Sequence, residues 1–136
     1  PHVPEVLACL HRNIRIGIVT CCQKMHFKTI HDASGLRPFF DFVVGDGDFE
    51  RHKPYPDPYL TALERAGISP EEAIAVEDSE RGVLSAIRAG LRVAAIPRGI
   101  SLCGDFSAAT WRLQDIRELP ALLDSLQPRK ENSQPQ

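Results

Sequence analysis

The chain has 136 residues, of which 43% are hydrophobic and 25% are charged, proportions that are typical of one ordinary globular domain with a modest core. Its formal net charge is -2 and it carries no basic stripe, which argues against nucleic acid or an acidic membrane surface as its main partner. No apolar run is long enough to span a bilayer, and no signal peptide is recognisable. We therefore expect a cytoplasmic protein without nucleic-acid or membrane partners.

The four cysteines are Cys9, Cys21, Cys22 and Cys103. Their spacing fits neither a zinc site nor a disulfide framework, so free thiols in a reducing compartment are expected. A nucleophilic cysteine needs a nearby base, and no arginine stands six places after Cys21 or Cys22 to form a phosphate loop. We therefore expect these two side chains to behave as small buried hydrophobes.

The first half of the chain alternates between helical and extended patterns. Apolar residues at helical spacing predict a helix over residues 3–10, and a β-branched run predicts a strand over 14–19 that ends at Thr20. A second helix is expected over 22–34, with Met25, Ile30 and Ala33 facing inward and Gly35 ending it. Residues 42–44 form the next expected strand, which is followed by a turn containing Asp46.

The second half repeats this alternation. Asp57 is expected to cap a helix that has Pro58 at its first position and runs to Ala66. A strand over 73–76 precedes a helix over 80–89, for which Ser79 or Asp78 could serve as the cap. A strand over 92–96, a short strand over 110–112 and a helix over 116–126 complete the domain. The polar residues 127–136 are expected to form a disordered tail.

Helices that alternate with short apolar strands predict an α/β fold, a three-layer Rossmann-like parallel sheet with helices on both faces. Ligands of such sheets gather beyond the carboxyl ends of the strands. Several polar residues follow predicted strand ends and should therefore meet at one edge: Thr20, Asp46, Lys53, Glu77 and Asp78.

Glu77 and Asp78 are candidate metal ligands. Mg²⁺ prefers a few carboxylates and several waters in an octahedral shell, and Asp78 follows an apolar strand where its carboxylate could reach a metal. Glu77 could hold a metal-bound water or a neighbouring cation. The simpler alternative is that Asp78 only caps its helix and that Glu77 is solvated.

Lys53 and Thr20 are candidate phosphate ligands. Pro54 restricts the backbone of Lys53 toward extended geometry, and an ammonium there can neutralise both a phosphate oxygen and a nucleophilic carboxylate. The hydroxyl of Thr20, together with amides that follow it, could bind phosphate oxygens. A surface lysine on a proline-rich turn and a threonine that only caps its helix are the respective alternatives.

The segments Lys53-Pro54-Tyr55-Pro56-Asp57-Pro58 and Glu77-Asp78-Ser79-Glu80-Arg81-Gly82 resemble motifs of the haloacid dehalogenase (HAD) superfamily, in its β-phosphoglucomutase and phosphoglycolate phosphatase branch. The resemblance covers about residues 1–97. It implies that Lys53 and Thr20 are catalytic, that Thr20, Cys21 and Lys53 bind the phosphoryl group, and that Asp78 and Glu77 bind Mg²⁺. Relatives often have a small polar residue where Cys21 stands here.

One part of the HAD pattern is not found in these residues. The family's nucleophile lies in an Asp-x-Asp motif at the end of its central strand, where it forms an aspartyl-phosphate. The resemblance therefore implies a partial HAD core over residues 1–126. It also implies that the strands at 14–19 and 73–76 need a partner: each other, a second chain, or a missing N-terminal segment.

Two classes of function remain open. The first is a part of a magnesium-dependent phosphohydrolase that acts on a small phosphorylated metabolite and is inactive as an isolated chain. The second is a non-catalytic HAD-like module that serves in protein association. A phosphate-accepting receiver domain is a weaker third possibility, because its acidic residues should precede the threonine and the lysine.

Overall fold

The computed structural model describes residues 2–23 and 32–127. The expected helix over 22–34, with its inward residues Met25 and Ile30, lies largely outside the described residues. So does nearly all of the expected tail. Within the described part of the chain, no helix is long and apolar enough to cross a membrane.

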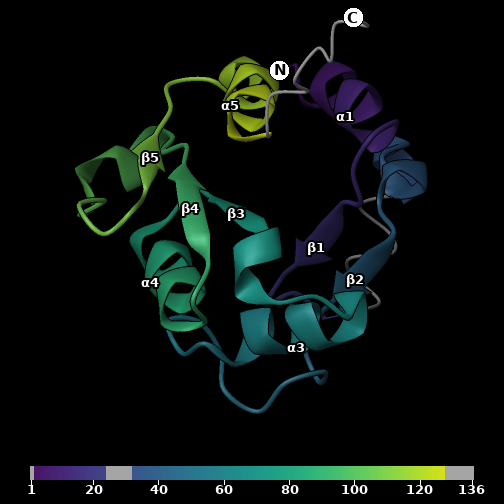
Figure 1. Cartoon of the computed structure of the whole chain (residues 1–136). Coiled ribbons are helices and arrows are strands. Elements are labelled where there is room, and N and C mark those ends of the chain that lie inside the picture. Colours follow the sequence, from purple (N-terminus) through teal and green to yellow (C-terminus); the bar gives the residue numbers. More distant parts are fainter. Residues whose placement is uncertain (1, 24–31, 128–136) are drawn as a thin grey trace, which may run out of the picture.

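The described chain forms short parallel strands between two pairs of helices (Figure 1). The strands are β1 (Gly17–Val19), β2 (Phe42–Val44), β3 (Ile74–Glu77), β4 (Arg92–Ala95) and β5 (Trp111–Arg112). The α-helices are α1 (Val3–His11), α3 (Asp57–Ala66), α4 (Glu80–Arg88) and α5 (Leu119–Leu126). The mixed α/β class predicted from the sequence is thus confirmed.

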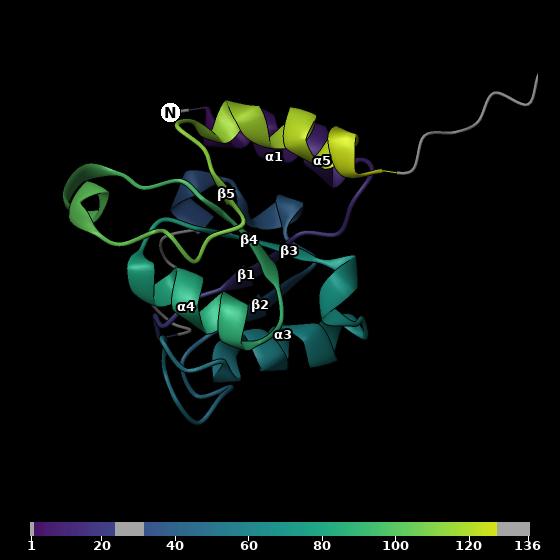
Figure 2. The same ribbon diagram turned by 60° about the vertical axis from the view of Figure 1, so that its left-hand side comes forward.

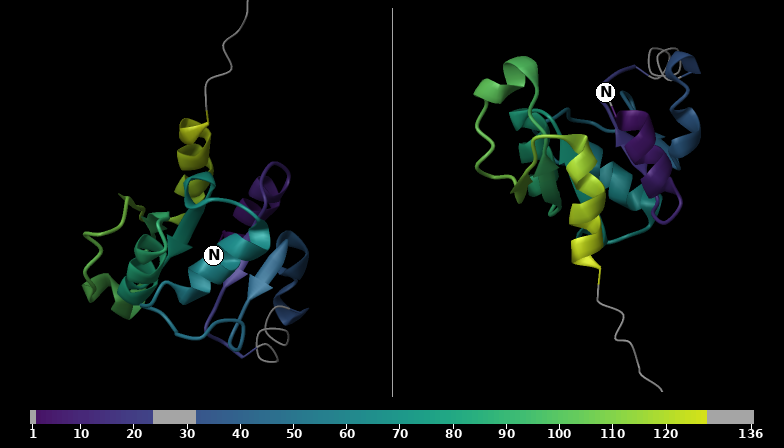
Figure 3. Two further views of the ribbon diagram at one scale, coloured as in Figure 1. Left: turned by 60° about the horizontal axis from the view of Figure 1, so that its bottom comes forward. Right: turned by 90° about the horizontal axis from the view of Figure 1, so that it is seen from above.

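The strands form two separate parallel sheets. One sheet has the order β1-β2 and the other has the order β3-β4-β5. Helices α3 and α4 cover one face and contact strands of both sheets, whereas α1 and α5 lie side by side on the opposite face (Figures 2 and 3). The strands thus occupy the middle of three layers.

The main buried core lies between the β3-β4 pair and the helices α3 and α4. It consists of one contiguous group of side chains with small residues on α4 and aromatic or branched residues around them: Tyr59, Leu63, Ala75, Val83, Ala86, Ala89, Leu91, Val93, Ala95 and Phe106. This packing holds α4, which follows β3, against α3, which follows the proline-rich loop. The two motif segments are therefore held by one core.

Local sequence signals explain the boundaries of α3 and α4. Helix α3 ends where Gly67 adopts a left-handed conformation with φ of 66° and donates its amide to Leu63 O at 2.9 Å. Helix α4 begins after Ser79, whose Oγ accepts a hydrogen bond from Gly82 N at 3.1 Å. Of the two caps considered for α4, Ser79 is therefore the one that the structure uses.

Three details of the predicted elements were wrong. Asp57 does not cap α3: the cap residue is Pro56, and the Asp57 carboxylate instead pairs with Arg51. Strand β1 is shorter than 14–19 because Ile16 N donates to the side chain of Asp41 at 2.7 Å rather than to a strand.

The third detail is the last predicted helix, which is divided into a 3-10 turn over Ile116–Glu118 and the helix α5. Pro120 lies in the first turn of α5. Its ring lacks an N–H and would clash with the carbonyl of Ile116 in one continuous α-helix, so the chain begins a new helix there.

Candidate active site

Lys53 connects the carboxyl ends of the two sheets. Its Nζ donates to the backbone oxygen of Val19, at the end of β1, at 3.3 Å. The same ammonium lies 2.5 Å from Glu77 Oε1, at the end of β3. Only 16% of the Lys53 side chain and 7% of the Glu77 side chain are exposed, so this charge pair is well shielded from solvent. A cation is thus fixed between two strand ends.

Glu77 is held from three sides. Its Oε1 also accepts a hydrogen bond from the hydroxyl of Tyr59, on α3. A Cβ atom added to Gly82 would overlap the Glu77 carboxylate, so only glycine at this position of α4 leaves room for it. The carboxylate is therefore oriented by protein groups, and its most direct action is to orient the Lys53 ammonium.

Tyr59 is suited to remain a hydrogen-bond donor. Burial, followed by the nearby negative charge of Glu77, raises the pKa of Tyr59 well above its usual value. The negative charge of Asp78 acts on the same hydroxyl in the same direction. The phenol thus lies among several of the residues that the sequence singles out, although the sequence analysis assigned it no role. The only feature of the sequence that could have drawn attention to Tyr59 is its place six residues after Lys53.

Asp78 is exposed at the end of β3. The cap of α4 is supplied by Ser79, so the capping role considered for Asp78 is already filled. Within residues 2–23 and 32–127, no cation forms an ion pair with Asp78, and no three His, Cys, Asp or Glu side chains are grouped closely enough to hold a metal. An exposed carboxylate without a protein cation is a suitable ligand for a hard metal ion.

Thr20 and Cys21 follow β1. Thr20 Oγ1 accepts a hydrogen bond from Cys22 N at 3.1 Å, so the hydroxyl shapes the turn after the strand. Cys21 and Cys22 are exposed, as are Cys9 and Cys103. The expectation that Cys21 and Cys22 are buried was therefore wrong, because both lie in the loop beyond the sheet edge rather than in the core.

A shallow hollow of about 400 Å³ opens at this edge. Its lining combines two predicted phosphate ligands with three residues to which the sequence gave no binding role: Cys21, His52, Lys53, Ser79 and Arg81. Lysine and arginine give it a cationic character that suits an anion. Arg81 stands inside the second motif segment and His52 directly precedes the first, but the resemblance assigned a role to neither, so both were missed.

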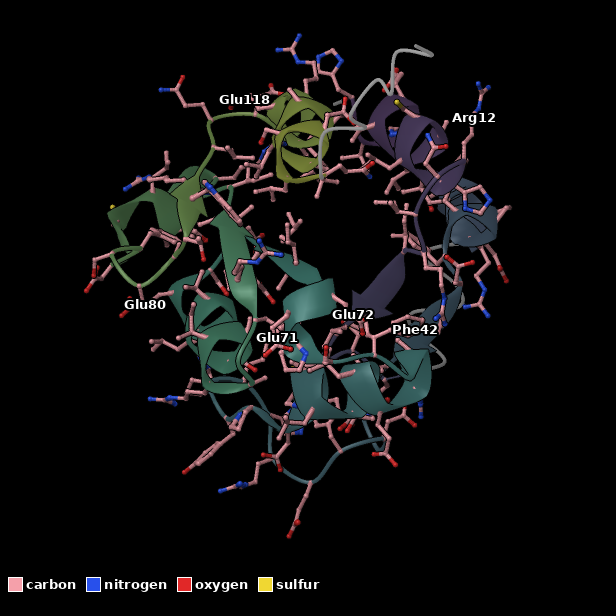
Figure 4. The ribbon with its side chains drawn as sticks, viewed as in Figure 1. Arg12, Phe42, Glu71, Glu72, Glu80 and Glu118 are labelled. Atoms are coloured by element: carbon pink, nitrogen blue, oxygen red, sulfur yellow. The ribbon has the colours of Figure 1, made fainter. Side chains whose placement is uncertain are left out.

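A cavity of about 680 Å³ separates β1 from β3. Strand residues such as Ile18 and Val76 line its sides, and mostly apolar side chains of α1, α3 and α5 close it above and below. It remains open when side chains are drawn, in the space above the labelled Glu72 (Figure 4). We call this space the strand gap. Each flanking strand has one neighbour only, so the backbone groups along its other edge lack a strand partner.

Comparison with known proteins connects this arrangement to one family. The family of haloacid dehalogenase-like hydrolases matches residues 1–96. The CbbY protein of Rhodobacter capsulatus is 35% identical over 106 residues, which cover 76% of this chain and 47% of that protein. Phosphoglycolate phosphatase of Escherichia coli K12 is 33% identical over 91 residues, which cover 66% of this chain and 36% of that protein.

Solved structures agree in fold. CbbY of Rhodobacter sphaeroides, in complex with xylulose-1,5-bisphosphate, aligns with a TM-score of 0.81 at 30% identity and covers 88% of this chain and 55% of that one. A HAD phosphatase of Thermococcus onnurineus aligns with the same TM-score at 29% identity and covers 90% of this chain and 57% of that one. The chain thus spans less than half of the two curated relatives named above.

Proposed function

The chain belongs to the haloacid dehalogenase-like hydrolase family, and we propose that it forms part of a magnesium-dependent phosphohydrolase that acts on a small organic phosphate. The observation that carries this proposal is the Lys53 ammonium, which is fixed between the ends of β1 and β3 by Val19 and Glu77. A fixed cation at this edge can stabilise the charge of a phosphoryl group during transfer. The named relatives, which include a phosphoglycolate phosphatase, support an enzymatic role over a purely associative one.

Each site residue has a proposed role. Lys53 binds a phosphate oxygen and supports the attacking carboxylate, while Thr20 and Cys21 contribute the phosphate contacts beyond β1. Glu77 and Tyr59 keep the ammonium in place. Asp78 would hold Mg²⁺, with Glu77 beside it, and the metal would neutralise charge on the phosphate. Because Glu77 is already engaged by Lys53 and Tyr59, Asp78 is the more direct of the two metal ligands.

The strand gap is the proposed place of the nucleophile. A parallel strand in the gap would pair with β1 and β3 at once, and its carboxyl end would lie beside Lys53. An aspartate at that end could attack phosphorus with the leaving group departing in line, forming an aspartyl-phosphate that water then hydrolyses. The strand would come from a missing N-terminal segment or from a second chain. We therefore propose that the isolated chain is not a complete enzyme.

Complementation tests this function. The chain would be mixed with a peptide that carries the family's nucleophile strand with its Asp-x-Asp motif, and phosphate release from an aryl phosphate would be measured with Mg²⁺. We expect activity only in the mixture, and we expect it to be lost in Lys53→Met or when the first aspartate of the peptide becomes asparagine. Turnover by the chain alone at about 1 per second or more would contradict the proposal.

Metal titration examines Asp78 separately. We expect the isolated chain to bind Mg²⁺ weakly, because one exposed carboxylate supplies only part of an octahedral shell. Calorimetry should show tighter binding when the peptide is present, and Asp78→Asn should abolish that gain. Glu118→Gln, which removes an acidic group away from the site, is the control. Tight binding by the chain alone that survives Asp78→Asn would exclude Asp78 as the ligand.

A further inference from the structure

The proline-rich loop that carries Lys53, residues 52–56, is called the lysine loop. Three of its successive carbonyls accept hydrogen bonds from the side chains of one helix, α4. Lys53 O accepts from Arg81 Nη2 at 2.6 Å. Pro54 O accepts from Arg88 Nη1 at 3.0 Å. Tyr55 O accepts from Ser85 Oγ at 2.6 Å. We call the donors Arg81, Ser85 and Arg88 the α4 clamp.

The spacing of the α4 clamp places its members on one side of the helix. Residues four and then three positions apart lie one above another along an α-helix, and the donors are at positions 81, 85 and 88. One stripe of α4 therefore runs along the loop and meets consecutive peptide units. The donors do not follow the order of the loop, since Ser85 bonds to residue 55 and Arg88 to residue 54. Three donors on one stripe nevertheless satisfy three consecutive carbonyls, which a chance contact of a single long side chain would not do.

Ser85 is the strongest indication that the stripe has a specific role. Its relative exposure is 0%, and Glu77 is the only other buried polar or charged residue in the described part of the chain. A hydroxyl placed in a core costs free energy unless it finds a hydrogen-bond partner. Here that partner is the carbonyl of Tyr55, so the buried hydroxyl is used to hold the loop.

The two arginines of the clamp are used in an unusual way. Arginine commonly pairs with carboxylates, but within residues 2–23 and 32–127 no acidic side chain forms an ion pair with Arg81 or Arg88. Each guanidinium instead donates to a backbone carbonyl. Both side chains are exposed residues of α4, so their clearest contribution is to fix the loop rather than to fill the core.

The loop needs such external donors. Pro54 and Pro56 have no N–H group, so this stretch of backbone has few donors with which to bond to itself. Its one described internal bond in this stretch runs from Tyr55 N to His52 O at 3.0 Å. Without the clamp, the carbonyls of residues 53–55 would be bonded mainly to water, and the loop could move relative to β3.

We propose that Arg81, Ser85 and Arg88 are positioning residues that fix the Lys53 ammonium relative to the Glu77-Asp78 doublet. Only the cap residue Ser79 separates that doublet from α4, so the acidic end of β3 and the support of the lysine loop are joined through one helix. The proposal rests on the proposed function only in giving Lys53 a catalytic role. Its structural content, a lysine held in place by α4, stands independently of that role.

Chemical labelling of Lys53 tests the clamp without requiring catalysis. The folded chain would be treated with an amine-acylating reagent, and modification of Lys53 would be followed by peptide mass spectrometry and normalised to the chain unfolded in denaturant. We expect Arg88→Gln, Arg81→Gln and Ser85→Ala each to increase Lys53 labelling. Loss of one such hydrogen bond corresponds to about a fivefold change. Arg88→Lys should restore most of the protection.

Arg92→Gln is the matched control, because Arg92 Nη2 also donates to a backbone carbonyl, that of Glu71 at 3.2 Å, but from β4 and away from the lysine loop. Denaturant unfolding of every variant would show that each remains folded. Unchanged labelling of Lys53 in folded Arg81→Gln and Arg88→Gln would overturn the clamp, and so would an equal rise in Arg92→Gln. If the clamp is found but the complemented chain releases no phosphate, the proposed function fails while this inference stands.

Discussion

At the scale of single residues, the site depends on groups that surround the motifs as much as on the motif residues themselves. The sequence predicted Lys53, Glu77 and Asp78 from their spacing, but it did not indicate that Tyr59 shares the Glu77 carboxylate with Lys53. That contact depends on how α3 packs against β3, which no local pattern determines. The contact yields a prediction that is specific to Tyr59.

Tyr59→Phe should change the alkaline stability of the chain. The pKa of Tyr59 is raised in the folded state, chiefly by burial, so above about pH 10 the unfolded chain releases this proton while the folded chain retains it. Stability should therefore fall as the pH rises above 10, by about 1.4 kcal/mol per pH unit. Denaturant unfolding between pH 8 and pH 11 (roughly the range set by the usual phenol pKa) should show this component disappear in Tyr59→Phe.

Tyr55→Phe is the control for this measurement, because 47% of Tyr55 is exposed. It should leave the alkaline loss of stability in place. At neutral pH, Tyr59→Phe should itself cost about 1–3 kcal/mol, since the charged carboxylate of Glu77 loses a donor. An alkaline profile of Tyr59→Phe that matches the parent chain would show that the buried phenol does not contribute to it.

Gly82→Ala should destabilise the chain although alanine normally favours a helix. The added methyl group would overlap the Glu77 carboxylate, and overpacking of this kind typically costs about 1–3 kcal/mol. In a Glu77→Ala background the overlap is removed, so the same substitution should become neutral or stabilise by about 0.5–1 kcal/mol. Urea unfolding of the four proteins of this cycle gives the coupling. Equal costs in both backgrounds would contradict the contact.

At the scale of secondary structure, the sequence predicted most elements because their local signals agree with their burial. The expected strand at 42–44 coincides with β2, and the expected helix at 58–66 matches α3 except that α3 begins one residue earlier, at Asp57. Two of the errors arose where a tertiary contact competes with a local pattern, and the third, at Pro120, arose from a local steric effect. Aspartate is a residue type that often caps helices, but the carboxylate of Asp57 binds Arg51 instead. The backbone N–H of Ile16 donates to the side chain of Asp41 instead of extending β1.

Ser79→Ala should weaken α4 at the end that carries the acidic doublet. The Ser79 hydroxyl satisfies the amide of Gly82, and loss of such a cap typically costs about 1 kcal/mol. Ser125→Ala in α5 is the control, because that hydroxyl is exposed and donates to Leu122 O within its own helix. Thermal unfolding should show a clearly larger decrease for Ser79→Ala. Equal effects of the two substitutions would mean that the cap does not stabilise α4.

At the scale of the whole molecule, the most consequential feature is the strand gap between the two sheets. The sequence analysis left open whether the strands at 14–19 and 73–76 pair with each other or with another segment. In the described structure they do not pair with each other, and a cavity lies between them. Each buried backbone group without a partner costs about 1–3 kcal/mol. Several such groups would offset much of the roughly 5–15 kcal/mol by which an ordinary domain is stable.

We therefore predict that an apolar strand binds in the gap and that blocking one edge prevents it. Val76 lines the gap and is 42% exposed, whereas Leu60 is 49% exposed and does not line it. Val76→Lys should abolish binding of the strand peptide used for complementation, because the bound peptide would bury a charge that β3 carries, and Leu60→Lys should not. Fluorescence anisotropy of a labelled peptide measures this directly. Sedimentation and circular dichroism provide the opposing outcome: a strictly monomeric chain that melts cooperatively and binds no peptide would mean that the two sheets close on each other in solution.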